Sequence, residues 1–278
     1  AGVLAARAAY VGGCAGTSNT QAGWRYGIPV MGTSAHSWVM SFSSETESFR
    51  QLQRVLGAGV VQLVDTYDPL EGTRKVARLG PPLAGVRLDS GDGLALSRQV
   101  RSILDEAGLT DAHIMLSGDL DEYRIRALLA AGAPVDSFGV GTQLATSGDA
   151  PNLSAIYKLV EVDISGIKRF TAKYSEDKAT LPGSKQVFRR ESYDVLARSG
   201  ECGTGEALLR PVILGGQLVE PLPGLDAARE RARRSLQHFP ASLRDLDSTE
   251  VWPVRQSDDL LALVERTRRN LAAVPAIS

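Results

Sequence analysis

The sequence predicts an α/β fold built on a parallel β-sheet. Between residue 28 and about residue 145, short apolar runs alternate with amphipathic segments. Successive apolar runs begin roughly 23–32 residues apart, which is the length of a strand followed by a crossover helix. Four of these runs also end in Asp, Ser, Thr or Gly. Polar strand ends of this kind are typical of an active-site rim at the carboxyl edge of a parallel sheet.

The expected elements of this first half follow in chain order. Residues 1–10 (AGVLAARAAY) are typical of the middle of a helix. The expected strands are 28–32 (IPVMG), 60–66 (VVQLVDT), 83–89 (LAGVRLD), 113–117 (HIMLS) and 137–141 (SFGVG). Residues 93–107 and 120–131 carry Leu, Ile, Val and Tyr near helical spacing, so we expect crossover helices there. Gly132 then ends the second of these helices.

After about residue 150 the pattern changes from alternating strands and helices to strands joined by turns. Residues 156–163, 167–175 and 185–192 predict antiparallel strands, separated by turn sequences such as ISG and LPGS. Two helices are expected near the end of the sequence, at 225–239 and 256–272.

Composition narrows the class of protein. The 278 residues are 43% hydrophobic and 23% charged, and the net charge is -1. This balance is ordinary for a soluble globular protein and gives no argument for a nucleic-acid or membrane partner. No apolar run approaches the roughly 20 residues of a membrane span. Cys14 and Cys202 are too few for a disulfide framework, so we expect reduced thiols in a cytoplasmic protein.

Three histidines are present, and one of them has the surroundings of a catalytic residue. His36 lies among small residues in MGTSAHSW, just after an expected strand, where its ring would stay accessible. His113 begins an apolar strand and His238 lies near the end of a helix, so both are interpreted as structural. We therefore expect His36 to take part in the chemistry.

Carboxylates at three strand ends are expected to converge. Asp65, Asp89, Asp92 and Asp119 end or follow neighbouring strands. Together such groups can bind Mg²⁺, orient a histidine or accept hydrogen bonds from sugar hydroxyls. Each of them could instead cap the next helix. We favour a functional role for Asp65 and Asp89, and both interpretations stay open for Asp92 and Asp119.

Glycine-rich strand ends and one arginine indicate an anionic ligand. The loop residues in question are Ser117, Gly118, Gly139, Gly141 and Thr142, whose backbone amides are open to phosphate oxygens. Arg87 adds a fixed positive charge suited to bidentate binding of phosphate or carboxylate. No Walker A motif and no GxGxxG before a helix is present. These parts predict an enzyme for a phosphorylated, hydroxyl-rich anion.

Seven motifs resemble those of the nicotinate phosphoribosyltransferase family, in the same order and with matching spacing. They are GTSNTQAGWRYGIPVMGTSAHSW (16–38), VDTYD (64–68), GVRLDSGD (85–92), SGDLDE (117–122), FGVGT (138–142), YKLVE (157–161) and TLPGSKQVFR (180–189). The resemblance implies an enzyme of NAD biosynthesis that joins nicotinate to 5-phosphoribosyl 1-pyrophosphate, giving nicotinate mononucleotide and pyrophosphate. It further implies ATP hydrolysis through a phosphohistidine, Mg²⁺ as cofactor and a homodimer.

The resemblance also implies roles for individual residues. The phosphorylated catalytic histidine would be His36, oriented by Asp65, with Asp89 as a further catalytic carboxylate. Substrate would contact Arg87, Ser18, Asn19 and Ser90, and the 5′-phosphate would lie on Gly118, Gly139, Gly141 and Thr142. Mg²⁺, if protein-bound, would lie near Asp89 and Asp119.

The fold implied by the resemblance is an irregular α/β barrel of the type II phosphoribosyltransferase kind, with a partial second α/β domain. We expect residues 1–150 to form an incomplete barrel core with the active site. Residues 151–224 would add antiparallel strands that complete the barrel or the second domain, and 225–278 would add helices. Family members carry a further N-terminal portion, so we expect this chain to be a piece of something longer.

Three alternatives fit these residues less well. Nicotinamide phosphoribosyltransferase places an Asp in the segment matching 16–19, whereas GTSN has no carboxylate to repel nicotinate. Quinolinate phosphoribosyltransferase should need a richer basic cluster than Arg87 supplies. A non-catalytic nucleotide-binding remnant need not keep His36, Arg87 and Asp89 together, so the enzyme is favoured.

Overall fold

The computed structural model describes residues 1–176 and 178–272. The chain divides into two compact units. The first comprises residues 1–152 together with 225–233, and the second comprises 153–224 together with the described residues from 234 onward. Each unit carries sheet structure of its own, so each is built separately from its strands.

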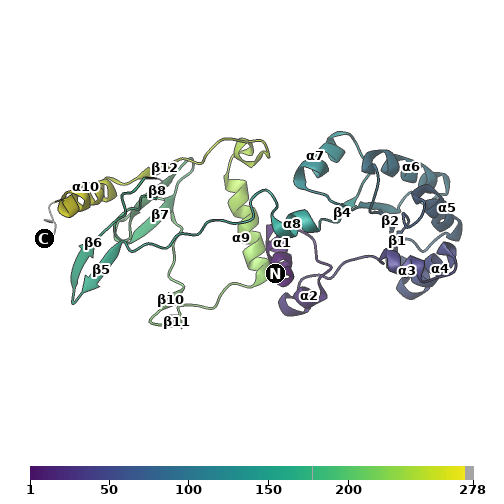
Figure 1. The fold of residues 1–278 in the computed structure, drawn as a ribbon, viewed down its shortest axis with the longest axis horizontal. Helices are drawn as coiled ribbons and strands as arrows, with labels where there is room; N and C mark the ends of the chain where they lie inside the picture. The colour runs from purple at the N-terminus through teal and green to yellow at the C-terminus, as the bar shows by residue number, and fades with distance from the viewer. Residues whose placement is uncertain (177, 273–278) are drawn as a thin grey trace. The chain divides into compact units, whose positions relative to one another are not determined.

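The first unit is organised around a four-stranded parallel sheet (Figure 1). Its strands, in spatial and chain order, are β1 (Val61–Leu63), β2 (Gly85–Leu88), β3 (His113–Leu116) and β4 (Ser137–Phe138). The crossover helices are α5 (Pro69–Leu79), α6 (Gly93–Glu106) and α7 (Glu122–Ala130). The β/α spacing of the sequence is thereby confirmed for four of the five expected strands.

The expected strand at 28–32 is wrong. Val30 forms only an isolated parallel bridge with Thr17. Pro29 lacks an N–H and can only accept, which it does from the N–H of Thr17 at 3.0 Å. Gly27, in the left-handed conformation, ends the preceding helix immediately before this stretch. The run is therefore apolar but cannot extend a hydrogen-bonded ladder.

Apolar side chains that share one face of the parallel sheet pack against the crossover helices and form the core of the first unit. Val86 and Ile114 are fully buried, and Val100 and Leu104 of α6 pack in the same cluster. Burial of strands under crossover helices produces the continuous apolar runs seen in the sequence. Each of the three crossover helices starts at an aspartate whose carboxylate accepts a backbone N–H of the first turn. The polar strand ends therefore also begin the helices.

Further helices of the first unit precede or follow the sheet strands in the chain. They are α1 (Gly2–Gly12), α2 (Thr20–Tyr26), α3 (His36–Met40), α4 (Glu45–Leu56) and α8 (Thr142–Thr146), with α9 (Leu225–His238) much later in the chain. The start of α9 packs on α1, because Arg229 lies over the ring of Tyr10, 4.4 Å from its centroid. Tyr10 also donates a hydrogen bond to Asp226 at 3.0 Å. These contacts bring residues 225–233 into the first unit.

The second unit carries the predicted antiparallel strands. One sheet has the order β12-β8-β7-β9, from β7 (Lys185–Arg189), β8 (Asp194–Arg198), β9 (Glu206–Ala207) and β12 (Val254–Gln256). Two hairpins accompany it: β5 (Glu161–Ile164) with β6 (Ile167–Phe170), and β10 (Ile213–Leu214) with β11 (Gln217–Leu218). The helix α10 (Asp258–Ala272) follows β12, close to the expected 256–272.

The second unit also departs from expectation. Residues 156–160 have no regular structure, so the expected strand over 156–163 begins only at Glu161. The strand β12 pairs in parallel with β8, an arrangement that its three residues did not predict. Among the described helices, none is long and apolar enough to cross a membrane.

Candidate active site

Polar side chains from four segments meet at the carboxyl ends of β1, β2 and β3. We call Thr33, His36, Arg87, Asp89 and Ser117 the strand-end cluster. The guanidinium of Arg87 organises it, donating from Nε to Ser117 Oγ at 2.8 Å and from one terminal nitrogen to Thr33 Oγ1 at 2.8 Å. The other terminal nitrogen lies 2.5 Å from Asp89 Oδ1. Three of five N–H groups are thus used, which leaves two for an anionic ligand.

The carboxylate of Asp89 is held from both sides. Its Oδ1 atom also accepts the hydroxyl of Ser117 at 2.5 Å. Burial by itself raises the pKa of this carboxyl. The hydrogen bonds from Ser117 and Arg87, with the charge of Arg87, outweigh burial and hold the pKa below its usual value. Asp89 is therefore a fixed negative charge at neutral pH.

His36 is the first residue of α3, and both of its ring nitrogens have neighbours. Nδ1 lies 3.1 Å from Thr66 Oγ1, and Nε2 lies 3.5 Å from Asp89 Oδ2. The side chain remains 40% exposed, so a reactant can reach the ring. The expectation of an accessible ring agrees with this exposure, but the strand expected just before it, at 28–32, is reduced to the single bridge at Val30.

The predicted contact between Asp65 and His36 is absent among the described contacts. Asp65 is only 8% exposed, and its Oδ2 accepts the backbone N–H of Asp89 and the hydroxyl of Ser90, each at 2.7 Å. Its other oxygen is buried without a hydrogen-bond partner. The ring instead meets Thr66, the next residue of the loop after β1. Asp65 instead positions the Asp89–Ser90 turn.

The glycines at the strand ends differ in what they do. Gly118 has φ 91°, and a Cβ there would lie 2.1 Å from the carbonyl oxygen of Asp89. A Cβ on Gly139 would lie 2.9 Å from the methyl group of Met115 and 3.1 Å from the Cβ of Ser117. Both glycines therefore allow backbone to approach the strand-end cluster. Gly141 precedes α8 and has open space around it, and Thr142 is exposed at the start of α8.

Ser18 and Asn19 are brought near the cluster by the short bridge at Thr17. A Cβ on Gly32 would lie 3.9 Å from the Cβ of Ser18, so Ser18 lies beside the loop that carries Thr33. Ser18 is exposed. Asn19 caps α2, since its side-chain oxygen Oδ1 accepts the backbone N–H of Ala22 at 2.9 Å. Only the side-chain amide group of Asn19 remains open to a ligand.

Asp92 and Asp119, for which both a capping and a functional role were open, differ in the structure. Asp92 caps α6, where its Oδ1 accepts the N–H groups of Leu94 and Ala95. Asp119 caps nothing, because Asp121 caps α7, and its backbone has a left-handed φ of 48°. Within the part of the chain that the structure describes, no three His, Cys, Asp or Glu side chains are grouped as metal ligands would be. The expected Mg²⁺ near Asp89 and Asp119 stays a prediction.

Space for a ligand adjoins the cluster. A cavity of about 480 Å³ lies between the ends of β2 and β3, the start of α6 and α7. Ser90, Ser117 and Gly118 form part of its polar wall, and Leu94 and Leu128 form part of its apolar wall. A volume in the range of about 300–1,000 Å³ is usual for small-molecule sites.

Sequence reasoning missed the hydroxyl groups of Thr33 and Thr66 and the side-chain role of Ser117. All three lie inside recognised motifs, at 16–38, 64–68 and 117–122, so their place in the chain was an available signal. The partner that each hydroxyl group reaches depends on strand register, which the motifs alone do not show.

Comparison with known proteins identifies the family. Residues 3–176 match the profile described as the nicotinate phosphoribosyltransferase (NAPRTase) family, and residues 173–264 match the nicotinate phosphoribosyltransferase C-terminal domain. The chain belongs to the nicotinate phosphoribosyltransferase family. The family resemblance of the seven sequence motifs is confirmed.

Curated members of the family show how much of the protein the chain represents. It is 44% identical over 276 residues to nicotinate phosphoribosyltransferase pncB2 of Mycobacterium tuberculosis, covering 95% of this chain and 58% of that protein. It is 30% identical over 353 residues to the human nicotinate phosphoribosyltransferase, covering 95% of this chain and 65% of that protein. The chain therefore spans little more than half the length of the first of these relatives.

Solved structures confirm the predicted fold class. Human nicotinic acid phosphoribosyltransferase aligns with a TM-score of 0.77 at 26% identity, over 95% of this chain and 67% of that one. Nicotinate-nucleotide pyrophosphorylase from Pyrococcus furiosus aligns with a TM-score of 0.70 at 28% identity, over 84% and 61%. The α/β architecture with its parallel sheet is that of the type II phosphoribosyltransferases.

Proposed function

We propose that the protein transfers the phosphoribosyl group of 5-phosphoribosyl 1-pyrophosphate to nicotinate, forming nicotinate mononucleotide and pyrophosphate for NAD salvage. The observation that best supports this reaction is the strand-end cluster, in which Arg87 and Asp89 form an ion pair of 2.5 Å beside His36. It lies within the residues that match the family. The bond from ribose C1 to the pyrophosphate oxygen breaks, its electrons leave with pyrophosphate, and the pyridine nitrogen bonds to C1.

The two charges of the cluster suit opposite ends of this reaction. Positive charge develops on the ribose ring as pyrophosphate leaves, and the ionised Asp89 would stabilise it. The two remaining N–H groups of Arg87 would hold the carboxylate of nicotinate. Because Arg87 is pinned by Thr33 and Ser117, this donor needs little reorganisation when substrate binds.

Phosphate binding is proposed for the strand-end loops. The left-handed backbone at Gly118 turns this loop against the Asp89 backbone, without a side chain that would block a phosphate oxygen. Gly139 directly follows β4, the strand next to β3, and Gly141 and Thr142 come after it in the chain. These residues carry the 5′-phosphate in the proposed complex.

ATP coupling is proposed to run through His36. The γ-phosphoryl group of ATP would pass to a ring nitrogen, and ADP would leave. Because Nε2 already faces Asp89 at 3.5 Å, a phosphoryl group on the ring would add negative charge beside the strand-end cluster. That charge would alter how the cluster binds substrate and product. Asp65 acts indirectly, by holding the Asp89–Ser90 turn.

Mg²⁺ is proposed as a cofactor that enters with the phosphates of the substrates. Asp89 is already engaged by Arg87 and Ser117, and no cage of protein ligands forms among the described residues. Mg²⁺ is commonly held by one or two carboxylates plus substrate phosphates, where it neutralises their charge.

Preference for nicotinate over nicotinamide is proposed to depend on residues 16–19. This segment contains no carboxylate, and the bridge between Thr17 and Val30 holds it beside the loop that carries Thr33. Thr33 in turn accepts from Arg87. An acidic side chain here would repel the nicotinate carboxylate, so its absence favours the acid.

A cytoplasmic homodimer is the proposed working form. Both cysteines are free, as is usual in a reducing compartment. Near the site, Trp24, Val30 and Met31 expose 86%, 54% and 55% of their surface, and apolar side chains of this size are often covered by a partner.

The test uses the full-length parent protein. Nicotinate mononucleotide is measured by chromatography with nicotinate or nicotinamide as acceptor, with and without ATP. Arg87→Ala should lower kcat/KM for nicotinate at least a hundredfold. Arg101→Ala is the matched control, because Arg101 is equally buried (21% exposed against 22%) and also paired with an aspartate, but lies on α6 outside the cluster. Equal activity of the two variants would refute the proposed site.

Incubation with γ-labelled ATP tests His36 separately. The full-length protein should take up an acid-labile, base-stable label that His36→Ala abolishes together with ATP stimulation. Undiminished label in that variant would refute the phosphohistidine assignment.

A further inference from the structure

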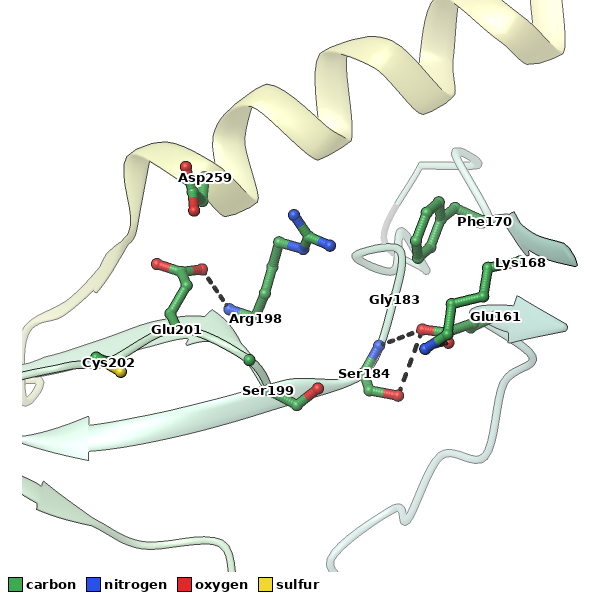
Figure 2. Close-up of a pocket in the computed structure, with 11 residues that line it drawn as sticks. Glu161, Lys168, Phe170, Gly183, Ser184, Arg198, Ser199, Glu201, Cys202 and Asp259 are labelled. Atoms are coloured by element: carbon green, nitrogen blue, oxygen red, sulfur yellow. Dashed lines mark hydrogen bonds and ion pairs between the residues drawn. The ribbon is translucent and has the colours of Figure 1, made fainter. Parts of the chain in front are cut away.

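A second cavity of about 480 Å³ lies within the second unit (Figure 2). Its walls come from the β5–β6 hairpin, the start of β7, the turn after β8 and the first turn of α10. None of its residues belongs to the unit that carries the strand-end cluster. Its lining is mostly polar, with charged side chains of both signs, so the chemistry of each group decides what the cavity accepts.

Arg198 is the most telling residue of this cavity. It ends β8 and is half-buried, and Figure 2 shows its side chain extending towards the space between α10 and Phe170. Its guanidinium lies over the Phe170 ring, 5.9 Å from the centroid. Among the contacts of the described residues, this guanidinium makes no hydrogen bond and no ion pair. Arg189, on the adjacent strand, instead makes two hydrogen bonds to Asp194. The guanidinium of Arg198 thus keeps its N–H groups available as donors to a ligand.

A second cation faces the same space. Lys168 lines the cavity and pairs with Glu161 at 2.8 Å. The hydrogen bond that Lys168 donates to Glu161 raises the pKa of Lys168, whereas the nearby charge of Arg198 opposes this rise. Two cations that repel each other across a cavity are stabilised together when an anion lies between them.

Two of the three carboxylates of the cavity are already engaged. Glu161 accepts the backbone N–H of Ser184 at 3.0 Å in addition to its ion pair. Glu201 shapes the turn after β8, since its Oε1 accepts the Arg198 backbone N–H at 2.6 Å and the Ser257 hydroxyl at 2.8 Å. These contacts build the walls of the cavity rather than serve a ligand.

The remaining groups are complementary to a ligand with two kinds of polar end. Asp259, exposed on the first turn of α10, has no hydrogen bond or ion pair among the described contacts. The exposed Ser199 lies next to Arg198 and adds a hydroxyl. A free carboxylate would repel a bare polyanion but would accept hydrogen bonds from hydroxyl groups. A phosphate with hydroxyls at its far end therefore fits better than phosphate alone.

We propose that this cavity binds a sugar phosphate or nucleotide, with its phosphate on Arg198 and Ser199 and its hydroxyl groups on Asp259. Its volume lies within the about 300–1,000 Å³ that is usual for small-molecule sites. Arg198 binds the phosphate through two N–H groups at once. Lys168 attracts the phosphate by its charge while it keeps its ion pair with Glu161. This proposal does not depend on the reaction assigned to the strand-end cluster.

Calorimetric titration of the full chain with ribose 5-phosphate tests the proposal. All proteins carry Arg87→Ala, so that binding at the strand-end cluster is suppressed. Adding Arg198→Ala should weaken binding at least tenfold, and Arg198→Lys should recover only part of it. Arg169→Ala is the charge-matched control, because Arg169 neighbours Lys168 on β6 but does not line the cavity. That control should change affinity less than twofold.

Two further probes test the roles of the separate groups. Ribose 5-phosphate should bind at least fivefold more tightly than inorganic phosphate, and Asp259→Asn should narrow that difference. Amide signals of Ser199 to Cys202 should shift on titration in heteronuclear NMR spectra. Unchanged affinity in a folded Arg198→Ala protein would overturn the site, as would shifts confined to the first unit. Equal binding of phosphate and ribose 5-phosphate would overturn the assignment of Asp259.

Discussion

Loss of a single hydroxyl group, in Ser117→Ala, should weaken catalysis through the two charges that it links. Ser117 Oγ accepts from Arg87 Nε at 2.8 Å and donates to Asp89 Oδ1 at 2.5 Å. Hydrogen bonds to charged groups are worth about 1.5–3 kcal/mol each. If one such contribution is lost in the transition state, kcat/KM falls about 10- to 150-fold, because 1.36 kcal/mol corresponds to a factor of ten.

The same variant should move the acid limb of the pH profile upwards. The Ser117 hydrogen bond is one of the contacts that lower the pKa of Asp89 against the effect of burial. Without it, Asp89 takes up a proton at a higher pH, and the ionised form needed at the ribose disappears sooner on acidification. We therefore expect the pH at which kcat/KM falls to half to be higher in Ser117→Ala than in the unmodified protein.

The assay is kcat/KM for nicotinate across pH, using the full-length parent. Ser97→Ala serves as the control, because this fully buried serine donates to the Leu94 carbonyl within α6 and does not touch the cluster. An unshifted acid limb together with kcat/KM within twofold of the unmodified protein would refute the role given to Ser117. A loss shared equally by the control would show a general effect on folding.

Three further outcomes are expected. Thr66→Val removes the neighbour of His36 Nδ1, so the label from γ-labelled ATP should fall several-fold, and full labelling would contradict this. Gly118→Ala should lower stability by about 1–3 kcal/mol in thermal melts, because its φ of 91° strains any other residue. Arg189→Met should cost about 3 kcal/mol in urea unfolding by leaving Asp194 buried and unpaired. The Arg189 hydrogen bond, against burial, lowers the pKa of Asp194, so this stability is present at neutral pH and fades on acidification; a pH-independent difference would contradict the assignment.

Much of the first unit could be predicted because its signals are local. The repeat length of the β/α units, the apolar runs and the aspartates before helices each act within a few residues. Parallel order then follows, because short crossovers join neighbouring strands. The second unit was less predictable, since the parallel pairing of β12 with β8 joins segments more than fifty residues apart in sequence.

Residue type and spacing were enough to predict the family, the parallel sheet and the place of Arg87 and Asp89 at the end of a strand. They also indicated His36 as a reactive residue. The partner that each side chain meets, by contrast, follows from how the distant segments pack. Thr66 rather than Asp65 contacts the ring of His36, and this depends on the path of the loop that follows β1. Hydrogen bonds act over about 3 Å, so contacts between distant segments are set by register and packing, not by composition.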